Sequence, residues 1–297
     1  MSVRPTRRLR ELLAGPDLVI APGVADALNA RIVAETGFDA IYMTGAGTTA
    51  VRLGMPDVGL MTMVEMADNA GRIADASGLP LIADADTGYG GPVNVMRTVR
   101  TFEKAGVAGI HIEDQQWPKR CGHLSGKTLI PAAEMAAKIR AACDARHDED
   151  FVIIARTDAL AVDGMNAALD RAAAYEEAGA DLIFVESPRN MEEISAIPRA
   201  LTKPALFNMA SSGKTPFLSK EEIAAEGFKL AIYPNFALLS AISAVRKTLG
   251  ELKRTGTVSH IVDDIASFRE FFDLMGMKQV QEMEARYGID EATRVDY

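Results

Sequence analysis

The sequence lacks the features of secreted, membrane-spanning and nucleic-acid-binding proteins. It contains only two cysteines, Cys121 and Cys143, so no disulfide framework can form and a reducing compartment is expected. No uninterrupted apolar run approaches the roughly 20 residues that a membrane span needs. The formal net charge of −9 argues against nucleic acid and an anionic membrane surface as main partners. An anionic substrate stays compatible with this charge, because a local site can oppose the global sign.

The N-terminal segment is basic without being apolar. Met1–Leu13 carries four arginines but no apolar stretch, so it is not typical of a secretory signal. Because Glu11 and then Asp17 follow closely, we expect an ordinary amphipathic helix, although charge alone leaves a transit peptide open. We therefore predict a cytoplasmic protein.

Short apolar segments rich in β-branched residues recur along the 297 residues, with helical patterns between them. The predicted strands are Leu18–Ala21, Ala40–Met43, Leu79–Ala83, Ala108–Ile112, Phe151–Ala155, Leu182–Val185, Ala205–Phe207 and Leu230–Tyr233. The predicted helices include Pro92–Lys104, Ala132–Arg146, Asn166–Glu177 and Lys220–Ala225. Nearly continuous apolar strands are typical of parallel sheets buried on both faces. Eight strand–helix alternations predict an α/β fold, a (β/α)8 TIM barrel, as a single domain over residues 1–297.

A weak internal repeat supports the barrel. Four segments share one order, in which a helix ends, a glycine follows and a strand begins. The glycines are Gly37, Gly106, Gly179 and Gly227. We expect each to end its helix in a left-handed conformation.

Residues 237–297 form a helical C-terminal extension with no strand signal. An apolar cluster lies in its second half, comprising Phe268, Phe271, Phe272, Leu274, Met275 and Met277. The cluster could pack on its own barrel or on a neighbouring subunit. We favour a role in oligomerisation.

Charged residues follow several of the predicted strands. They are Asp84 and Asp86, Glu113, Arg156 and Glu186. Catalytic groups of such barrels lie at the C-terminal ends of the strands, so these side chains are expected to share one rim. Clustered carboxylates repel one another, and a hard divalent cation such as Mg²⁺ would compensate them. We expect Asp84 and Asp86 to leave the same face of their strand. Surface caps and salt bridges are the alternative.

The segment Gly45–Ala50 consists of small residues after the second strand. We predict a loop whose backbone N–H groups approach a substrate carboxylate or carbonyl. A dinucleotide site is the weaker alternative, because no acidic residue closes a strand about 20 residues further on.

The segment Lys119–His123 places Cys121 among two cations and a histidine. Such surroundings stabilise a thiolate, so Cys121 could exchange a proton with substrate. A loop above a barrel mouth is also typical of a lid. The alternative is an exposed cysteine in a basic loop. Zinc is not expected, because no second Cys or His pair has suitable spacing. His111, inside the fourth strand, is interpreted as a barrel-interior residue.

The segment Lys119–His123 also resembles the signature of the isocitrate lyase and phosphoenolpyruvate mutase superfamily. Further motifs follow in that superfamily's order, at Asp84–Gly90, His111–Gln115, Ala155–Ala159, Val185–Ser187 and Gly213–Pro216. The resemblance runs from about residue 5 to residue 290, and within the superfamily it is closest to the 2-methylisocitrate and dimethylmalate lyases.

The resemblance implies a carbon–carbon lyase that depends on Mg²⁺, with Mn²⁺ as a substitute. The implied metal positions are Asp57, Asp84, Asp86 and Glu113. The implied substrate positions are Thr44, Gly45, Ala46, Gly122, Arg156, Glu186 and Asn208. Cys121 corresponds to the catalytic acid/base, with Lys119 and His123 beside it, and Tyr42 could help to deprotonate the substrate. A homotetramer with an exchanged C-terminal helix is also implied.

Two stretches depart from the superfamily pattern. A glutamate that usually follows Asn208 is replaced by a run that ends in Ser211 and Ser212. After Pro234, Asn235 and Phe236 replace a leucine and a small hydroxyl residue. We predict that Ser211 or Ser212 contacts a substrate carboxylate.

The expected reaction is cleavage of a 2-hydroxy di- or tricarboxylic acid, of the 2-methylisocitrate or 2-alkylmalate type, to pyruvate or glyoxylate and a second carboxylic acid. The alternatives are an oxaloacetate hydrolase or decarboxylase, a phosphonopyruvate-type enzyme, and a barrel that binds an organic acid without turning it over.

Overall fold

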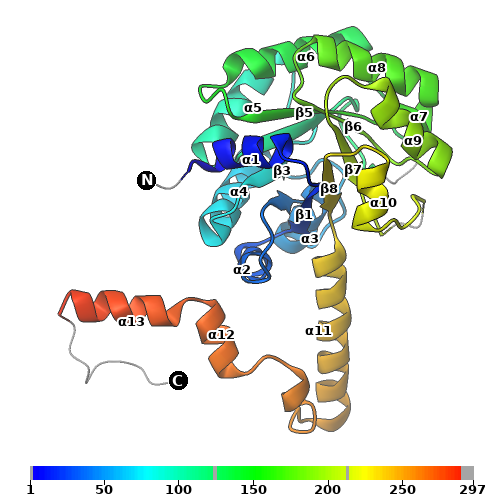
Figure 1. The fold of residues 1–297 in the computed structure, drawn as a ribbon. Coiled ribbons are helices and arrows are strands. Elements are labelled where there is room, and N and C mark those ends of the chain that lie inside the picture. The colour runs from blue at the N-terminus through cyan, green and yellow to red at the C-terminus, as the bar shows by residue number, and fades with distance from the viewer. Residues whose placement is uncertain (1–2, 123–125, 212–213, 289–297) are drawn as a thin grey trace. The chain divides into compact units, whose positions relative to one another are not determined.

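The computed structural model describes residues 3–122, 126–211 and 214–288. Eight parallel strands form one closed barrel in sequence order, which confirms the predicted TIM barrel (Figure 1). The strands are β1 (Val19–Val24), β2 (Ile41–Met43), β3 (Leu81–Asp84), β4 (Gly109–Glu113), β5 (Val152–Thr157), β6 (Leu182–Val185), β7 (Ala205–Asn208) and β8 (Leu230–Tyr233). Pairing of β1 with β8, with Val19 opposite Leu230, closes the barrel.

Helices alternate with the strands and surround the barrel (Figure 1). They are α1 (Pro5–Ala14), α2 (Ala27–Glu35), α3 (Gly45–Leu53), α4 (Met63–Ser77), α5 (Pro92–Lys104), α6 (Ala132–Ala145), α7 (Ala159–Val162), α8 (Met165–Glu177), α9 (Met191–Ala200) and α10 (Lys220–Ala225). The bounds of α5 and α10 are those that the sequence predicts. The four repeat glycines have φ values of 89°, 83°, 104° and 98°, so the predicted left-handed helix ends are confirmed.

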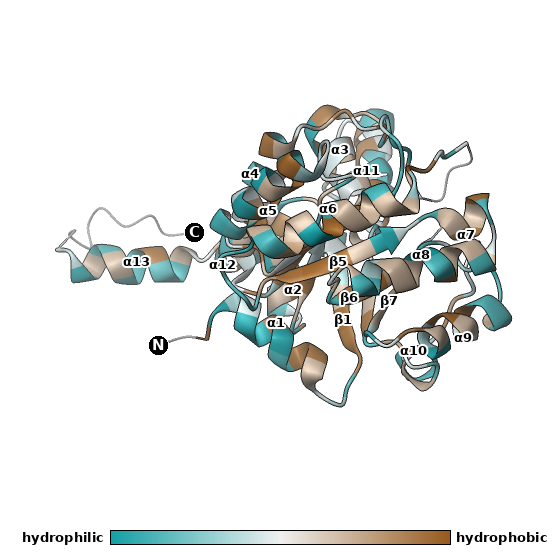
Figure 2. Ribbon diagram, turned by 90° about the horizontal axis from the view of Figure 1, so that it is seen from above, coloured by the Kyte–Doolittle hydropathy of each residue, from teal (hydrophilic) through white to brown (hydrophobic). Residues whose placement is uncertain are grey.

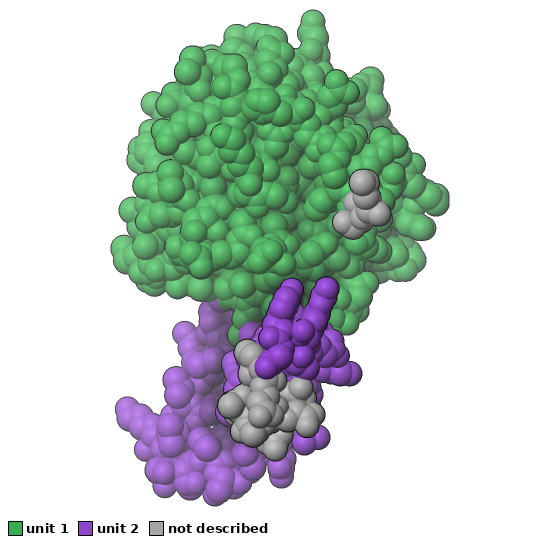
Figure 3. Space-filling view, turned by 90° about the vertical axis from the view of Figure 1, so that its left-hand side faces the viewer, with its two compact units in different colours: residues 1–237 green, residues 238–297 purple. Residues whose placement is uncertain are grey.

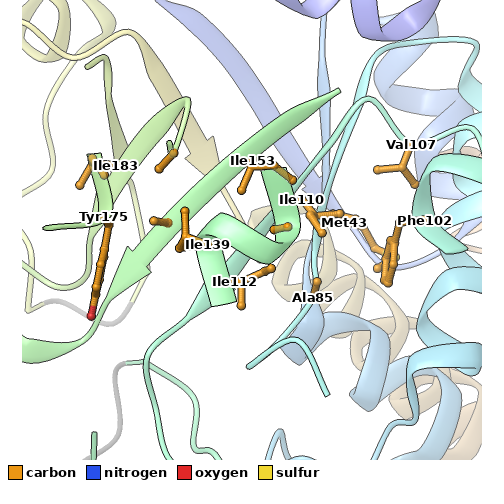
Figure 4. Packing of buried hydrophobic residues seen from close by; sticks show 14 of the residues in the cluster. Met43, Ala85, Phe102, Val107, Ile110, Ile112, Ile139, Ile153, Tyr175 and Ile183 are labelled. Carbon is orange, nitrogen blue, oxygen red and sulfur yellow. The ribbon is translucent and has the colours of Figure 1, made fainter. Parts of the chain in front are cut away.

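The core has two layers. The outer layer lies between strands and helices and includes Phe102 of α5, Ile139 of α6, Ile153 of β5 and Tyr175 of α8 (Figure 4). The inner layer fills the barrel itself and includes Leu9 of α1. Strand β5 is hydrophobic along most of its length and becomes hydrophilic at its C-terminal tip (Figure 2).

The inner layer determines where the polar side chains lie. Because side chains alternate along a strand, the residues that follow the inward apolar ones at a spacing of two also point inward. Val152 and Ile154 are inner-layer residues of β5, and Arg156 continues their series. The same alternation leads from Leu182 and Phe184 of β6 to the next residue of that series, Glu186. Apolar side chains therefore fill the lower barrel, and charged ones ring its C-terminal mouth.

The chain forms two compact units, residues 1–237 and residues 238–297 (Figure 3). The second unit holds most of α11 (Phe236–Thr255), a short 3-10 helix (Val262–Asp264), α12 (Phe268–Leu274) and α13 (Met277–Arg286). None of the described residues of α11, α12 and α13 is buried. In the described part of the chain, no helix combines the length and the apolar character that crossing a membrane requires.

Candidate active site

A cavity of about 50 Å³ lies at the C-terminal ends of the strands. Its lining comes from every strand end except β1, and most of it was predicted from the sequence. The lining residues are Tyr42, Thr44, Ala46, Asp57, Asp84, Glu113, Lys119, Cys121, Gly122, Arg156, Phe184, Glu186, Asn208, Ala210, Pro234 and Asn235.

Lys119 lies among the carboxylates of this cavity. Its Nζ is 2.7 Å from Oδ1 of Asp57 and 2.6 Å from Oδ1 of Asp86, and its side chain is 2% exposed. Burial alone would disfavour its charge, but Asp86, Glu113, Asp84 and Asp57 outweigh burial and raise the pKa of Lys119 well above its ordinary value. The ammonium is therefore the internal counter-ion of this acidic cluster.

One lysine does not neutralise the cluster. Burial, with the nearby charges of Asp84 and Asp57, raises the pKa of Asp86 to about 6 although Lys119 opposes the shift. Burial likewise raises the pKa of Glu113 well above its ordinary value. Among the described residues, Oε1 of Glu113 has no hydrogen-bond partner. The cluster is thus a place where additional positive charge would be stabilising.

Asp86 is placed in the cluster by a turn after β3, which the sequence analysis did not predict. Strand β3 ends at Asp84, and Asp86 lies beyond it in a left-handed conformation with φ of 47°. The backbone N–H of Asp86 donates to Oδ1 of Asp84 at 2.9 Å, and its carbonyl accepts from the N–H of Glu113 at 2.9 Å. The prediction that Asp84 and Asp86 share one face of a strand was therefore wrong, because Asp86 is not part of the strand. A tight turn brings Asp86 to Lys119.

The donor atoms of this cluster suit a hard divalent cation. Buried carboxylate oxygens are the ligands that Mg²⁺ prefers, and the excess negative charge calls for a cation. Within the described ranges, however, no three acidic, histidine or cysteine side chains are arranged to hold a metal ion together. Lys119 lies between Asp57 and Asp86 instead. The chemistry of the donors fits the ion, and in this arrangement the lysine supplies the countercharge.

Arg156 lies at the end of β5, over the ring of Phe184, with its Cζ 5.0 Å from the ring centroid. Its Nη2 is 3.1 Å from Oε2 of Glu186, and its Nε donates to Oδ2 of Asp158 at 3.0 Å. Burial disfavours the charge, but Asp158, Glu186 and Glu113 outweigh it and hold the pKa of Arg156 well above its ordinary value. A permanently charged guanidinium therefore faces the cavity.

Gly122 packs directly against this arginine. A Cβ at Gly122 would overlap Nη2 of Arg156 and approach Cγ and Cδ of Glu186 at 2.8 and 2.9 Å. Cys121, the preceding residue, is partly exposed and lines the cavity. The described part of the predicted lid therefore lies on the mouth of the barrel, and Cys121 is one of the residues that line the cavity. His123, also predicted to be catalytic, lies outside the described residues.

Tyr42 and His111 form a buried pair beneath the cavity. The hydroxyl of Tyr42 and Nε2 of His111 are hydrogen-bonded at 2.8 Å, and His111 is fully buried, as its barrel-interior interpretation requires. Burial lowers the pKa of His111 to about 4, so the ring is neutral at pH 7. Burial, with the charge of Asp84, raises the pKa of Tyr42 well above its ordinary value. The tyrosine therefore keeps its proton.

The small-residue segment after β2 is a helix and not the predicted loop. Thr44 caps α3, its Oγ1 accepting from the N–H of Gly47 at 3.2 Å, and donates to Oδ1 of Asn235 at 3.2 Å. The first N–H groups of a helix have no intrahelical partner and favour anions, so the start of α3 at Gly45 and Ala46 still suits a carboxylate. A Cβ at Gly45 would overlap the Asp84 carboxylate, so this position requires glycine.

Residues 9–253 match the family model described as phosphoenolpyruvate phosphomutase. The chain belongs to the phosphoenolpyruvate mutase/isocitrate lyase superfamily. It is 48% identical over 280 residues to 2,3-dimethylmalate lyase from Eubacterium barkeri, a match that covers 94% of this chain and 97% of the relative. It is 42% identical over 282 residues to 2-methylisocitrate lyase from Aeropyrum pernix, covering 95% and 91%.

Solved structures of the superfamily share the fold over nearly the whole chain. A crystal structure of 2,3-dimethylmalate lyase matches with a TM-score of 0.94 and 39% identity, covering 100% of both chains. Oxaloacetate acetylhydrolase with the inhibitor 3,3-difluorooxalacetate matches with a TM-score of 0.92 and 42% identity, covering 97% and 98%. Phosphonopyruvate hydrolase with oxalate and Mg²⁺ matches with a TM-score of 0.88 and 33% identity, covering 96% and 99%.

The two stretches that depart from the superfamily pattern lie differently with respect to the cavity. Asn208 lines it and donates to Oε1 of Glu186 at 3.2 Å. Ser211 is exposed and is not part of the lining, whereas Ala210 is. Ser212 lies outside the described residues, so contact of either serine with substrate stays a prediction. Asn235 lines the cavity, as its position after Pro234 suggested.

Phe184 is a site residue that sequence reasoning missed. It looks like any core aromatic in the strand Leu182–Val185, and it was not distinguished from its neighbours. The available signal is its spacing, because it stands two residues before Glu186 in the inward series of β6. Asp158, the buried partner of Arg156, is a second site residue that the sequence analysis did not single out.

Proposed function

We propose that this chain is a Mg²⁺-dependent carbon–carbon lyase that cleaves a 2-hydroxy di- or tricarboxylic acid, of the 2-alkylmalate or 2-methylisocitrate type. The products are an α-keto acid, pyruvate or glyoxylate, and a second carboxylic acid. The similarity to proteins named 2,3-dimethylmalate lyase and 2-methylisocitrate lyase supports the reaction class. The carrying observation is that Cys121 lines the same cavity as the buried acidic cluster, next to Gly122, which packs against Arg156 and Glu186.

The residues divide the work of cleavage among them. A carboxylate of the acidic cluster accepts the proton of the substrate hydroxyl, and the hydroxyl oxygen becomes the keto oxygen at C2. The bond between C2 and C3 then breaks, and its electron pair passes to C3 and the adjacent carboxylate. Arg156 offsets the negative charge that develops there. The thiol of Cys121 then donates its proton to C3, which completes the second carboxylic acid. Tyr42 keeps its own proton, so in this scheme its hydroxyl donates a hydrogen bond to the substrate and accepts one from Nε2–H of His111.

Asp57, Asp84, Asp86 and Glu113 would hold the Mg²⁺, with Mn²⁺ as a substitute. A bound divalent ion would polarise the substrate hydroxyl and lower its pKa. A related phosphonopyruvate hydrolase was crystallised with oxalate and Mg²⁺, which supports this assignment. The N-terminal turn of α3, with Thr44, Gly45 and Ala46, would bind the carboxylate of the keto-acid part.

The size of the cavity supports a site that opens and closes. A volume of about 50 Å³ has room for only a few waters. Any 2-alkylmalate is larger, so we infer that the substrate enters when Gly122 moves away from Arg156. Its return would exclude bulk water from the carbanion.

A second candidate function is hydrolysis of oxaloacetate. The structural match to oxaloacetate acetylhydrolase is nearly as close as that to the lyase. Cleavage in both reactions leaves charge next to a carboxylate, and the residues described above would suit either. A barrel that binds an organic acid without turnover is less well supported, because such a barrel has no use for a thiol such as Cys121 in the lining of its cavity.

The deciding experiment incubates the protein and Mg²⁺ with 2-alkylmalates, 2-methylisocitrate, isocitrate and oxaloacetate, and identifies products by mass spectrometry. We expect an α-keto acid from an alkylmalate or methylisocitrate, and loss of turnover in Cys121→Ser but not in Cys143→Ser. Oxalate and acetate from oxaloacetate alone would establish the hydrolase. No turnover of any compound would favour the binding barrel.

The remaining parts of the proposal concern assembly and location. We propose a homotetramer in which C-terminal helices are exchanged between subunits. The support is the exposed apolar surface of the C-terminal unit, where Phe268 is 69% and Phe271 45% exposed. With only two cysteines the chain has no disulfide framework, which is compatible with the proposed cytoplasmic location.

A further inference from the structure

Two buried polar side chains hold the backbone on either side of Cys121. Lys127 binds the residue after it, and Gln115 binds the residue before it. Neither side chain lines the cavity, so neither is in a position to contact the substrate directly. Both contacts lie within the described residues.

Lys127 connects the carbonyl of Gly122 to the residue that orients Arg156. Its Nζ donates to the Gly122 carbonyl at 2.5 Å and to Oδ1 of Asp158 at 2.7 Å. The Lys127 side chain is 2% exposed and Asp158 is fully buried. Asp158 also accepts from Nε of Arg156 at 3.0 Å and from its Nη2 at 3.2 Å. One carboxylate therefore fixes the guanidinium and, through Lys127, the backbone beside the thiol.

Gln115 binds Arg120 with both ends of its amide. Its Nε2 donates to the Arg120 carbonyl at 2.8 Å, and its Oε1 accepts from the Arg120 N–H at 3.0 Å. Gln115 is 1% exposed, so water cannot easily replace these bonds. The N–H of Gln116 also donates to the carbonyl of Thr128 at 2.8 Å. This backbone bond keeps the chain next to Lys127 close to the end of β4.

We propose that Lys127 and Gln115 are positioning residues that set where Cys121 lies relative to Arg156. The inference rests on the proposed function, in which Cys121 donates a proton to the substrate carbanion. Proton transfer needs the thiol at a fixed distance from that carbon, and two anchors, one on each side of a single residue, restrict its movement. The shared carboxylate of Asp158 means that the thiol and the guanidinium are positioned together.

The test uses Cys143→Ala protein, in which Cys121 is the only thiol, and compares it with added Lys127→Met or Gln115→Leu. We measure the rate of alkylation of Cys121 by iodoacetamide with intact-mass spectrometry, without substrate. We expect each variant to raise that rate about ten- to a hundredfold, the effect of losing one strong buried hydrogen bond. Loss of a cation alone would act in the opposite direction, because it makes a thiolate less favourable.

The matched controls remove a side chain of the same type at a position that does not bind the backbone next to Cys121. Lys229→Met removes another lysine whose ammonium binds a glycine carbonyl, that of Gly15, but at the N-terminal end of β8. Gln116→Leu removes the exposed amide next to Gln115. We expect neither control to alter alkylation of Cys121, and we expect Lys127→Arg to restore most of the slow rate.

Turnover supplies the second readout. On the substrate found in the panel experiment, Lys127→Met should lower kcat about ten- to a hundredfold with little change in KM. An unchanged or slower alkylation of Cys121 in both variants would overturn the proposal, even if kcat falls. If the wild type turns over nothing, the proposed function fails while the alkylation rates still decide the positioning. If Lys127→Met does not fold, Gln115→Leu alone carries the test, since it breaks no buried ion pair.

Discussion

Single residues at the mouth of the barrel have very little room. Gly122 has Arg156 and Glu186 where a side chain would begin, and Gly45 has the Asp84 carboxylate there. These contacts explain why glycines stand next to the charged residues, because only a bare backbone can approach them so closely. The close approach of the backbone to these charged side chains therefore depends on the absence of a Cβ at both positions.

Replacement of Gly122 by alanine should separate the segment from the guanidinium. The added Cβ overlaps Nη2 of Arg156, so either Arg156 or Cys121 must move by a substantial fraction of an ångström. We expect kcat/KM to fall by about a hundredfold, since a misplacement of this order has that effect. The control is Gly250→Ala in α11, where a Cβ meets no atom within 4 Å. Equal kinetics for the two variants would contradict this account of Gly122.

Much of the residue-level site could be predicted from the sequence, because its charged residues directly follow apolar strands. Asp84, Glu113, Arg156 and Glu186 were found in this way, and all four line the cavity. Lys127 and Gln115 could not be found, because their roles depend on backbone carbonyls that only the folded loop brings to them. A sequence shows the type of a side chain but not the peptide group it binds.

At the scale of elements, helix α8 supports the site from outside the barrel. Tyr175 of α8 donates through its hydroxyl to Oδ2 of Asp114 at 2.8 Å, and Arg171 of the same helix is 3.1 Å from that oxygen. Asp114 follows β4 and also accepts from the N–H of Asp158 at 2.9 Å. The helix thus anchors the ends of two neighbouring strands that carry site residues.

Tyr175→Phe should loosen this anchor without disturbing the packing of the ring. Asp114 keeps its bonds to Thr157, Arg171 and Asp158, so we expect a loss of about 1–2 kcal/mol in the free energy of unfolding. Denaturant titration would measure it. Tyr287→Phe, at a residue 78% exposed, is the control and should change nothing. Equal unfolding midpoints in the two variants would show that the hydroxyl of Tyr175 is dispensable.

The elements themselves were predictable where their apolar pattern is strong, and α3 shows where this fails. Its first residues, Gly45 to Thr49, are glycines, threonines and an alanine, which disfavour a helix or leave it undecided. Helix formation is nevertheless favoured by the Thr44 cap and by burial of Thr48 and Thr49. Tertiary packing supplies that second contribution, so local sequence could not reveal it.

At the scale of the whole molecule, the C-terminal unit combines an apolar sequence with exposure to solvent. Its helices carry large apolar side chains, yet none of their described residues is buried within this single chain. Leu249 and Val245 of α11 are 56% and 53% exposed. Large apolar side chains exposed in this way are typical of subunit interfaces, and homo-oligomers are the usual outcome.

Charges on this unit should therefore disrupt assembly. We expect the full chain to have the mass of a tetramer in light scattering after size exclusion, and Phe268→Asp with Phe271→Asp to give smaller species. Each buried phenylalanine contributes about 1.5–3 kcal/mol to such an interface, and a carboxylate there would be desolvated. Val93→Asp, at a 78% exposed residue of the barrel, is the matched control. A wild type that runs as a monomer would refute the assembly model.

Along β5 and β6, the side chains that stabilise the barrel are different from those at its mouth. The side chains that keep the barrel filled, such as Val152 and Leu182, lie below those that line the cavity, such as Arg156 and Glu186. Substitutions at the mouth can consequently redirect the chemistry while leaving the stabilising interior intact. Proteins named as a lyase, an acetylhydrolase and a hydrolase share this one fold. Such a barrel is a ready starting point for the evolution of new catalysts, because inventing a reaction does not require inventing a fold.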